Sequence, residues 1–147
     1  MQDNMADFIE FRFREDKIKD IIRRVTKKTK STTETITAEF AKILFERIVS
    51  GTPVDKGILK SRWSLVRTGD TSWRCINNTK YLKILEFGFY NNVGPKTIKI
   101  SASLRLNFGI RIIGGIFSKQ APHGWIRKAL SQTGNDFKSK LARKIKS

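Results

Sequence analysis

The chain has few of the residues that build catalytic or metal sites. Among 147 residues it has one cysteine, Cys75, and one histidine, His123. A single cysteine excludes an internal disulfide framework, and one cysteine with one histidine is too few for a zinc site. No nucleophile motif surrounds either residue, so a Ser-His-Asp or Cys-His catalyst is not indicated. Cys75 stands in the apolar stretch SWRCIN and is expected to be a small buried hydrophobic residue.

Acidic residues are scarce, and they are unevenly spread. The chain has 13 acids against 30 lysines and arginines, and after Glu86 the only acid is Asp136. A two-metal nuclease needs clustered carboxylates. Asp55, Asp70 and Glu86 are widely spaced, so a nuclease that gathers them in space is the one enzyme hypothesis left, and we do not expect it. No catalytic residue, metal or cofactor is predicted.

Long hydrophobic runs are absent as well. No run could span a bilayer, and the polar start MQDNMADF does not read as a signal peptide. With 39% hydrophobic and 10% aromatic residues, we expect one soluble folded domain over residues 1–147, synthesised in a reducing compartment. We predict an α+β fold: two N-terminal helices within 1–50, a β-rich part over 51–118 and a C-terminal helix over 122–146.

The first fifty residues have the apolar spacing of helices. One helix is predicted from Phe8 to about Lys30, with an acidic start and a basic end that suit its dipole. Ser31 to Glu34 reads as a capping box that opens a second helix, which ends at Gly51. Its apolar positions are Ile36, Phe40, Ile43 or Leu44, and Ile48.

The middle of the chain favours short strands. Residues 63–66 and 73–76 are predicted strands joined by a turn around Gly69. The stretch YLKILEFGF that follows is a short helix or a strand, ended by Gly88. A last helix is predicted from His123 towards Ile145, and Gly134 weakens its middle by ~1 kcal/mol relative to alanine.

The most regular pattern lies between Ile98 and Ile112, inside a predicted arm at 97–114. Even positions are apolar and odd positions are polar or glycine, as in a half-buried β-structure. The span exceeds the usual ~5–6 residues of a strand, so we expect a bent strand or a hairpin turning near Asn107. It is either an edge of the domain's own sheet or an arm that pairs with a neighbouring subunit. The arm's interface residues are then Ile98, Ile100, Leu104, Leu106, Phe108 and Ile110.

The net charge of +17 indicates an acidic partner, either nucleic acid or an anionic protein surface. Trp63, Trp73 and Trp125 lie among basic residues and could stack on bases, but we expect them to be core residues. Glu86 stands in a basic neighbourhood, and we predict that it is structural and paired with Arg74 or Arg62.

Three stretches in order, TPVDKGILKSRW, NNTKYLKILEFGF and APHGWIRKAL, resemble the tail-completion family of long-tailed bacteriophages. Lys80 and the run Pro122-His123-Gly124-Trp125 depart from the family pattern. The matching residues, all read as structural, are Thr52, Pro53, Asp55, Gly57, Leu59, Trp63, Asn78, Tyr81, Glu86, Phe87, Gly88, Pro122 and Ala129.

The resemblance implies a structural virion protein, made in the host cytoplasm, that forms a ring, a hexamer by the family pattern, at the neck of the phage. Its implied partners are copies of itself, the tail terminator or tail tube, and the head-completion or connector proteins. DNA would pass through without specific binding, and no membrane is involved. The alternatives are a tail terminator that caps the tail tube and, from another class, a basic nucleic-acid-binding domain.

A basic face on the last helix is the expected docking surface. We predict that it faces outward or towards an acidic neighbouring ring, because lysines that grip phosphates would slow DNA passage. The docking residues are Lys138, Lys140, Arg143 and Lys144.

Overall fold

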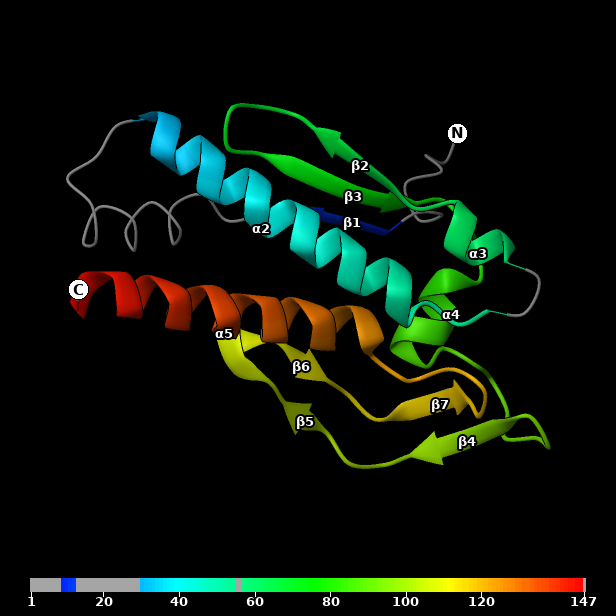
Figure 1. Cartoon of the computed structure of the whole chain (residues 1–147). Coiled ribbons are helices and arrows are strands. Elements are labelled where there is room, and N and C mark those ends of the chain that lie inside the picture. The colour runs from blue at the N-terminus through cyan, green and yellow to red at the C-terminus, as the bar shows by residue number, and fades with distance from the viewer. Residues whose placement is uncertain (1–8, 13–29, 55–56, 147) are drawn as a thin grey trace, which may run out of the picture.

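The computed structural model describes residues 9–12, 30–54 and 57–146, and it has the mixed α+β composition predicted from the sequence (Figure 1). The elements in chain order are β1 (Ile9–Arg12), α2 (Lys30–Gly51), α3 (Ile58–Ser61), β2 (Ser64–Arg67), β3 (Trp73–Asn77), α4 (Leu82–Phe87), β4 (Thr97–Ile100), β5 (Leu104–Arg105), the 3-10 turn η2 (Asn107–Gly109), β6 (Arg111–Ile112), β7 (Gly115–Ser118) and α5 (Trp125–Lys146).

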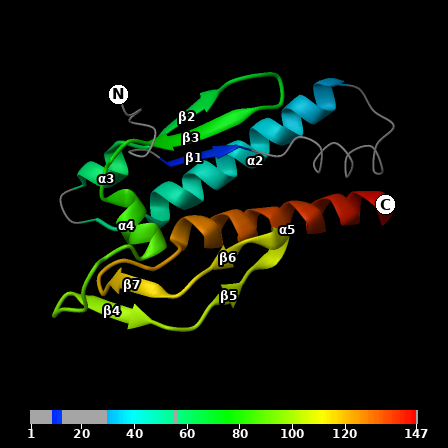
Figure 2. The ribbon, with the colours of Figure 1, turned by 180° about the vertical axis from the view of Figure 1, so that it is seen from behind.

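Two long antiparallel helices, α2 and α5, form the middle of the molecule. A three-stranded sheet lies on one side of them and the strands β4 to β7 lie on the other, in both views (Figures 1 and 2). The helix pair is held by apolar stripes: Leu44 and Ile48 of α2 and Ile126 of α5 are almost fully buried. Phe40 of α2 meets Phe137 of α5 edge to face, with ring centroids 4.9 Å apart. The burial confirms the apolar stripe predicted for the second helix.

The three-stranded sheet has the order β1-β3-β2, and all its pairs are antiparallel. The predicted strands at 63–66 and 73–76 are confirmed to within one residue, and so is the turn between them. The start of the first predicted helix is wrong: Ile9–Arg12 is a strand whose residues pair with 74–77 of β3. Non-local pairing with β3 overrides the local helical spacing there. The rest of that predicted helix lies outside the described residues.

The ribbon, residues 97–118, is the observed form of the alternating segment. β4 pairs with β7, and β5 pairs with β6 across the turn η2, so the predicted hairpin near Asn107 is confirmed. We name residues 104–112 the tip hairpin. The stretch YLKILEFGF, for which helix and strand were both open, contains the helix α4, and Gly88 ends it in a left-handed conformation.

Candidate functional site

The three sequence motifs meet at one end of the helix pair, where α2 ends and α5 begins (Figure 1). The first motif follows α2. The Thr52 hydroxyl donates to the Ile48 carbonyl at 2.7 Å, and the Trp63 indole N–H donates to the Thr52 oxygen at 2.9 Å. Thr52 thus satisfies a terminal carbonyl of α2 and orients a core tryptophan. The stretch TPVDKGILKSRW thus lies between the end of α2 and the start of β2.

The loop after α2 leads into α3 through Gly57, which has a left-handed φ of 77° and precedes the buried Leu59. The second motif is attached here. The fully buried Asn77 amide donates to the Leu59 carbonyl at 2.8 Å, and its oxygen accepts from the Thr79 N–H at 3.0 Å. Asn78, the residue named from the family pattern, is exposed. The side-chain amide that makes these hydrogen bonds belongs to its neighbour Asn77, and the sequence alone does not distinguish the two asparagines.

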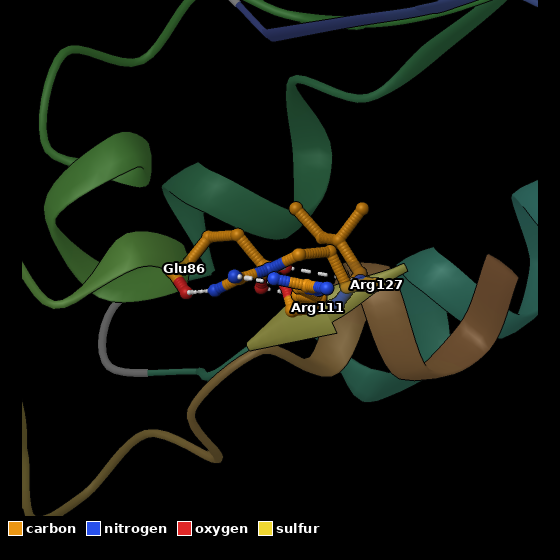
Figure 3. Close-up of polar contacts among 4 residues, drawn as sticks. Glu86, Arg111 and Arg127 are labelled. Atoms are coloured by element: carbon orange, nitrogen blue, oxygen red, sulfur yellow. Dashed lines mark hydrogen bonds and ion pairs between the residues drawn. The ribbon is translucent and has the colours of Figure 1, made fainter. Parts of the chain in front are cut away.

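Glu86 is the centre of the site (Figure 3). Its side chain is fully buried. Its carboxylate accepts three N–H groups at 3.0–3.1 Å: the backbone amides of Ile126 and Arg127, and Nε of Arg127. Both amides belong to the first turn of α5, where backbone N–H groups lack helical partners and attract negative charge. Glu86 of α4 therefore caps α5. We name Glu86 and these two partners the clamp.

The predicted cation partner of Glu86 is wrong in identity: it is Arg127, not Arg62 or Arg74. Arg127 lies 41 residues along the chain, a distance that no local pattern reports. Its guanidinium also donates to the carbonyls of Glu86 and Arg111, and it lies over the Phe87 ring at 4.7 Å. Burial raises the pKa of the Glu86 carboxyl, and the donors from Arg127 and Ile126 oppose part of that rise.

Close backbone approaches complete this end of the molecule. Gly88 has φ 72°, and a side chain there would meet the Phe117 ring at 2.6 Å. Gly51, the last residue of α2, leaves room for the Trp125 ring, which a Cβ would meet at 3.2 Å. Trp125 and Trp63 are core residues, as predicted, whereas Trp73 is half-buried with the Arg67 guanidinium 6.0 Å from its ring. The glycines therefore set how closely the motifs pack.

Some motif residues lie on the surface beside the clamp. Tyr81 is 46% exposed, Pro122 is exposed, and Asp55 lies outside the described residues. A groove of about 260 Å³ runs past Pro53, Ile58, Tyr81, Leu85 and Tyr90. The motif residues thus include the buried Glu86 of the clamp and exposed residues that line a partly apolar groove.

The ribbon differs from a core element because many of its apolar side chains are exposed to solvent. Ile98, Leu104 and Phe108 are 45–49% exposed, and Ile100, Leu106 and Ile110 are half-buried. Two contacts hold the ribbon on α5 and its N-terminal flank. The Phe108 ring packs on Gly134, and Ile112 packs on Gly124. Gly134, although it is a weak helix former, thus leaves the space that the Phe108 ring fills. Phe108 itself has a positive φ of 63°, which is unusual for a residue other than glycine.

The predicted docking face on α5 is only partly free. Lys138, Lys140 and Arg143 are exposed, and the side chain of Lys144 is outside the described set. Lys140 contacts Glu39 of α2 at 2.6 Å, and Asp136 contacts Arg47 at 2.5 Å. These pairs bridge the two long helices. Lys140 therefore has an intramolecular role that the sequence pattern did not indicate.

The remaining candidates have structural surroundings. Cys75 is buried as predicted, and burial raises the pKa of its thiol to about 12. The His123 ring packs on Phe117 with centroids 5.2 Å apart. Within the described residues, no three histidine, cysteine, aspartate or glutamate side chains gather as metal ligands. No helix in that part of the chain combines the length and apolarity required to cross a membrane.

Comparison with known families gives a match over part of the chain. Residues 16–88, about half of the chain, match the family described as "Bacteriophage HK97-gp10, putative tail-component". The match supports a phage tail family. It covers the first motif and ends on Gly88, so the phage tail component pattern includes Glu86 but not its partners on α5. Searches of curated proteins and of solved structures gave no significant match.

Proposed function

We propose that this phage tail component is a ring-forming tail-completion protein at the top of the tail, where it joins head and tail and has no catalytic role. The observation that carries the proposal is the open apolar face of the ribbon. Ile98, Leu104 and Phe108 leave roughly half of their surface in solvent, together with Ile113 at 67%. Large contiguous apolar surfaces of this kind mark interaction sites.

A second feature of the ribbon supports self-association. Among the described strands, β4 and β5 each have one partner, so no described strand pairs with their outer edges. Such edges are templates for an incoming strand from another copy. If the strand edge of each copy pairs with the next copy, and the rotation between copies closes, the copies form a ring.

The proposed neighbours are the tail terminator or tail tube below and the head-completion or connector proteins above. DNA would cross the ring without specific binding. We place the exposed basic residues of α5, Lys138 and Arg143 among them, on the docking face towards an acidic neighbour, because complementary charge speeds docking and sets its register. Lys140, which already contacts Glu39, contributes less to that face.

The test is assembly of the full chain. Negative-stain microscopy and sedimentation of the purified protein, free of nucleic acid, are expected to show rings. Leu104→Lys with Leu106→Lys places charge on the open face and is expected to give a folded monomer that fails in head–tail joining. Lys60→Glu with Lys80→Glu, both exposed and outside the ribbon, is the control for charge change without loss of the apolar face.

Two outcomes contradict the proposal. A chain that stays monomeric at high concentration and binds DNA tightly is a nucleic-acid-binding domain, the alternative that the charge of +17 favours. Rings that bind purified tail tubes at their end, and not head connectors, identify a tail terminator.

A further inference from the structure

Two arginines face each other on the tip hairpin. Arg105 and Arg111 are direct register partners in the antiparallel pair of β5 and β6. Directly opposite residues have Cβ atoms ~4.5–5.5 Å apart, and like charges in this position are destabilising. No acidic side chain in the described part of the chain pairs with either arginine, and Asp136 contacts Arg47 instead. Within the described residues this repulsion is therefore not balanced by an acidic partner.

The arginines share one hollow with apolar side chains. A cavity of about 410 Å³ is lined by Ser103, Leu104, Arg105, Arg111 and Ile113. Of these, Leu104 is 49% exposed and Ile113 is 67% exposed. Paired guanidinium groups bind carboxylates strongly. Arginine beside apolar side chains is typical of protein interfaces, whereas surfaces for DNA are more polar and more uniformly basic. The hollow therefore fits a protein segment that has carboxylates next to apolar residues.

The chain has such a segment of its own. The start MQDNMADF has Asp3 and Asp7 beside Met5 and Phe8, with no basic residue. This segment directly precedes β1, and β1 lies on the opposite side of the helix pair from the tip hairpin in both views (Figures 1 and 2). A contact between these two regions suits neighbouring copies better than one chain. Repeated from copy to copy, it is the head-to-tail arrangement that closes rings.

We propose that the hollow between Arg105 and Arg111 binds the acidic N-terminal segment of a second copy of this chain. The inference rests on the proposed ring and names a contact that holds it. A chain of charge +17 repels its own copies, so association needs local charge complementarity of this kind. The apolar neighbours Leu104 and Ile113 supply surface for Met5 and Phe8.

A charge-swap experiment on the full chain tests the contact. Arg105→Glu with Arg111→Glu, and separately Asp3→Lys with Asp7→Lys, are each expected to weaken self-association roughly 10-fold in sedimentation. All four changes together are expected to restore most of it. Salt at about 1 M, where the screening length is ~3 Å, is expected to reduce the difference between wild type and variants. Thermal melting verifies that each variant is folded, and the Lys60→Glu, Lys80→Glu chain is the matched control.

The outcomes separate this contact from the ring itself. If wild type forms rings and neither swap weakens them, the proposed contact is wrong but the proposed ring is supported. If both swaps weaken association but the combination restores nothing, the two regions do not meet. If the arginine swap leaves rings intact and abolishes binding to a DNA duplex, the hollow faces DNA. A wild-type chain that never associates overturns the contact and the proposed function together.

Discussion

The ribbon lies in the chain between Glu86 and the other two residues of the clamp, yet the clamp and the ribbon differ in how their groups are satisfied. At the clamp, a carboxylate is fully buried and both of its oxygens accept from N–H groups of the same chain. On the ribbon, apolar side chains are exposed and two arginines lie opposite each other with no acidic partner among the described residues. The contrast separates a part of the sequence that holds the fold together from a part that we propose serves assembly. Exposed apolar and like-charged groups cost stability in a monomer, so they indicate an external partner.

Loss of the clamp is expected to have the largest effect on the fold. Glu86→Ala leaves the half-buried Arg127 and two helix amides without their acceptor, so the free energy of unfolding should fall by about 3–5 kcal/mol. Glu86→Gln keeps one acceptor oxygen and should cost about 1–3 kcal/mol. Urea denaturation measures both. Glu39→Ala breaks an exposed pair and is the control, with a loss below about 1 kcal/mol. Equal losses at both sites would remove the distinction between the clamp and a surface pair.

A smaller change in the free energy of unfolding is expected from a substitution that tests the packing of the tip hairpin on α5. Gly134→Ala gains about 1 kcal/mol of helix propensity, but its Cβ would lie 2.6 Å from the Phe108 ring. We expect little or no gain in the wild-type chain and a gain near 1 kcal/mol when Phe108 is already alanine. A double-mutant cycle in urea gives the coupling. If Gly134→Ala gives the same gain in both backgrounds, the Phe108 side chain does not pack on Gly134 in solution.

The smallest expected effect is the pH dependence contributed by His123, between the clamp and the ribbon. Burial, with Lys128 and Arg127 nearby, lowers the pKa of its imidazole from 6.5. Protonation is then harder in the folded chain, so stability is complete above pH 6.5 and is lost as pH falls below it. Because the ring is partly solvated, the loss should be under about 0.5 kcal/mol. His123→Gln should flatten melting temperature against pH between about 7 and 5, and an unchanged slope would assign it to other groups.

Local patterns predicted the elements well and their partners poorly. Gly51 and Gly88 end helices where the sequence places the ends, and the alternation from Ile98 indicates β-structure with a turn near Asn107. The sequence could not reveal that Glu86 meets Arg127, because the pair forms only when α4 and α5 are brought together. It also could not distinguish Asn77 from Asn78, since burial of a single amide follows from packing. Pairing of Ile9–Arg12 with β3 is another long-range effect that periodicity does not report.

The clamp has a consequence for how related chains can differ. Glu86 and Arg127 close a loop of 41 residues that contains the whole ribbon, so the ribbon is an insert anchored at its base. The entropy of closing a loop grows slowly, by ~0.6 kcal/mol for each doubling of length. Two residues added beside Asn107 would therefore cost far less than one change at Glu86. The ribbon can change in length and charge to suit a new neighbour, while the anchoring pair keeps the domain intact.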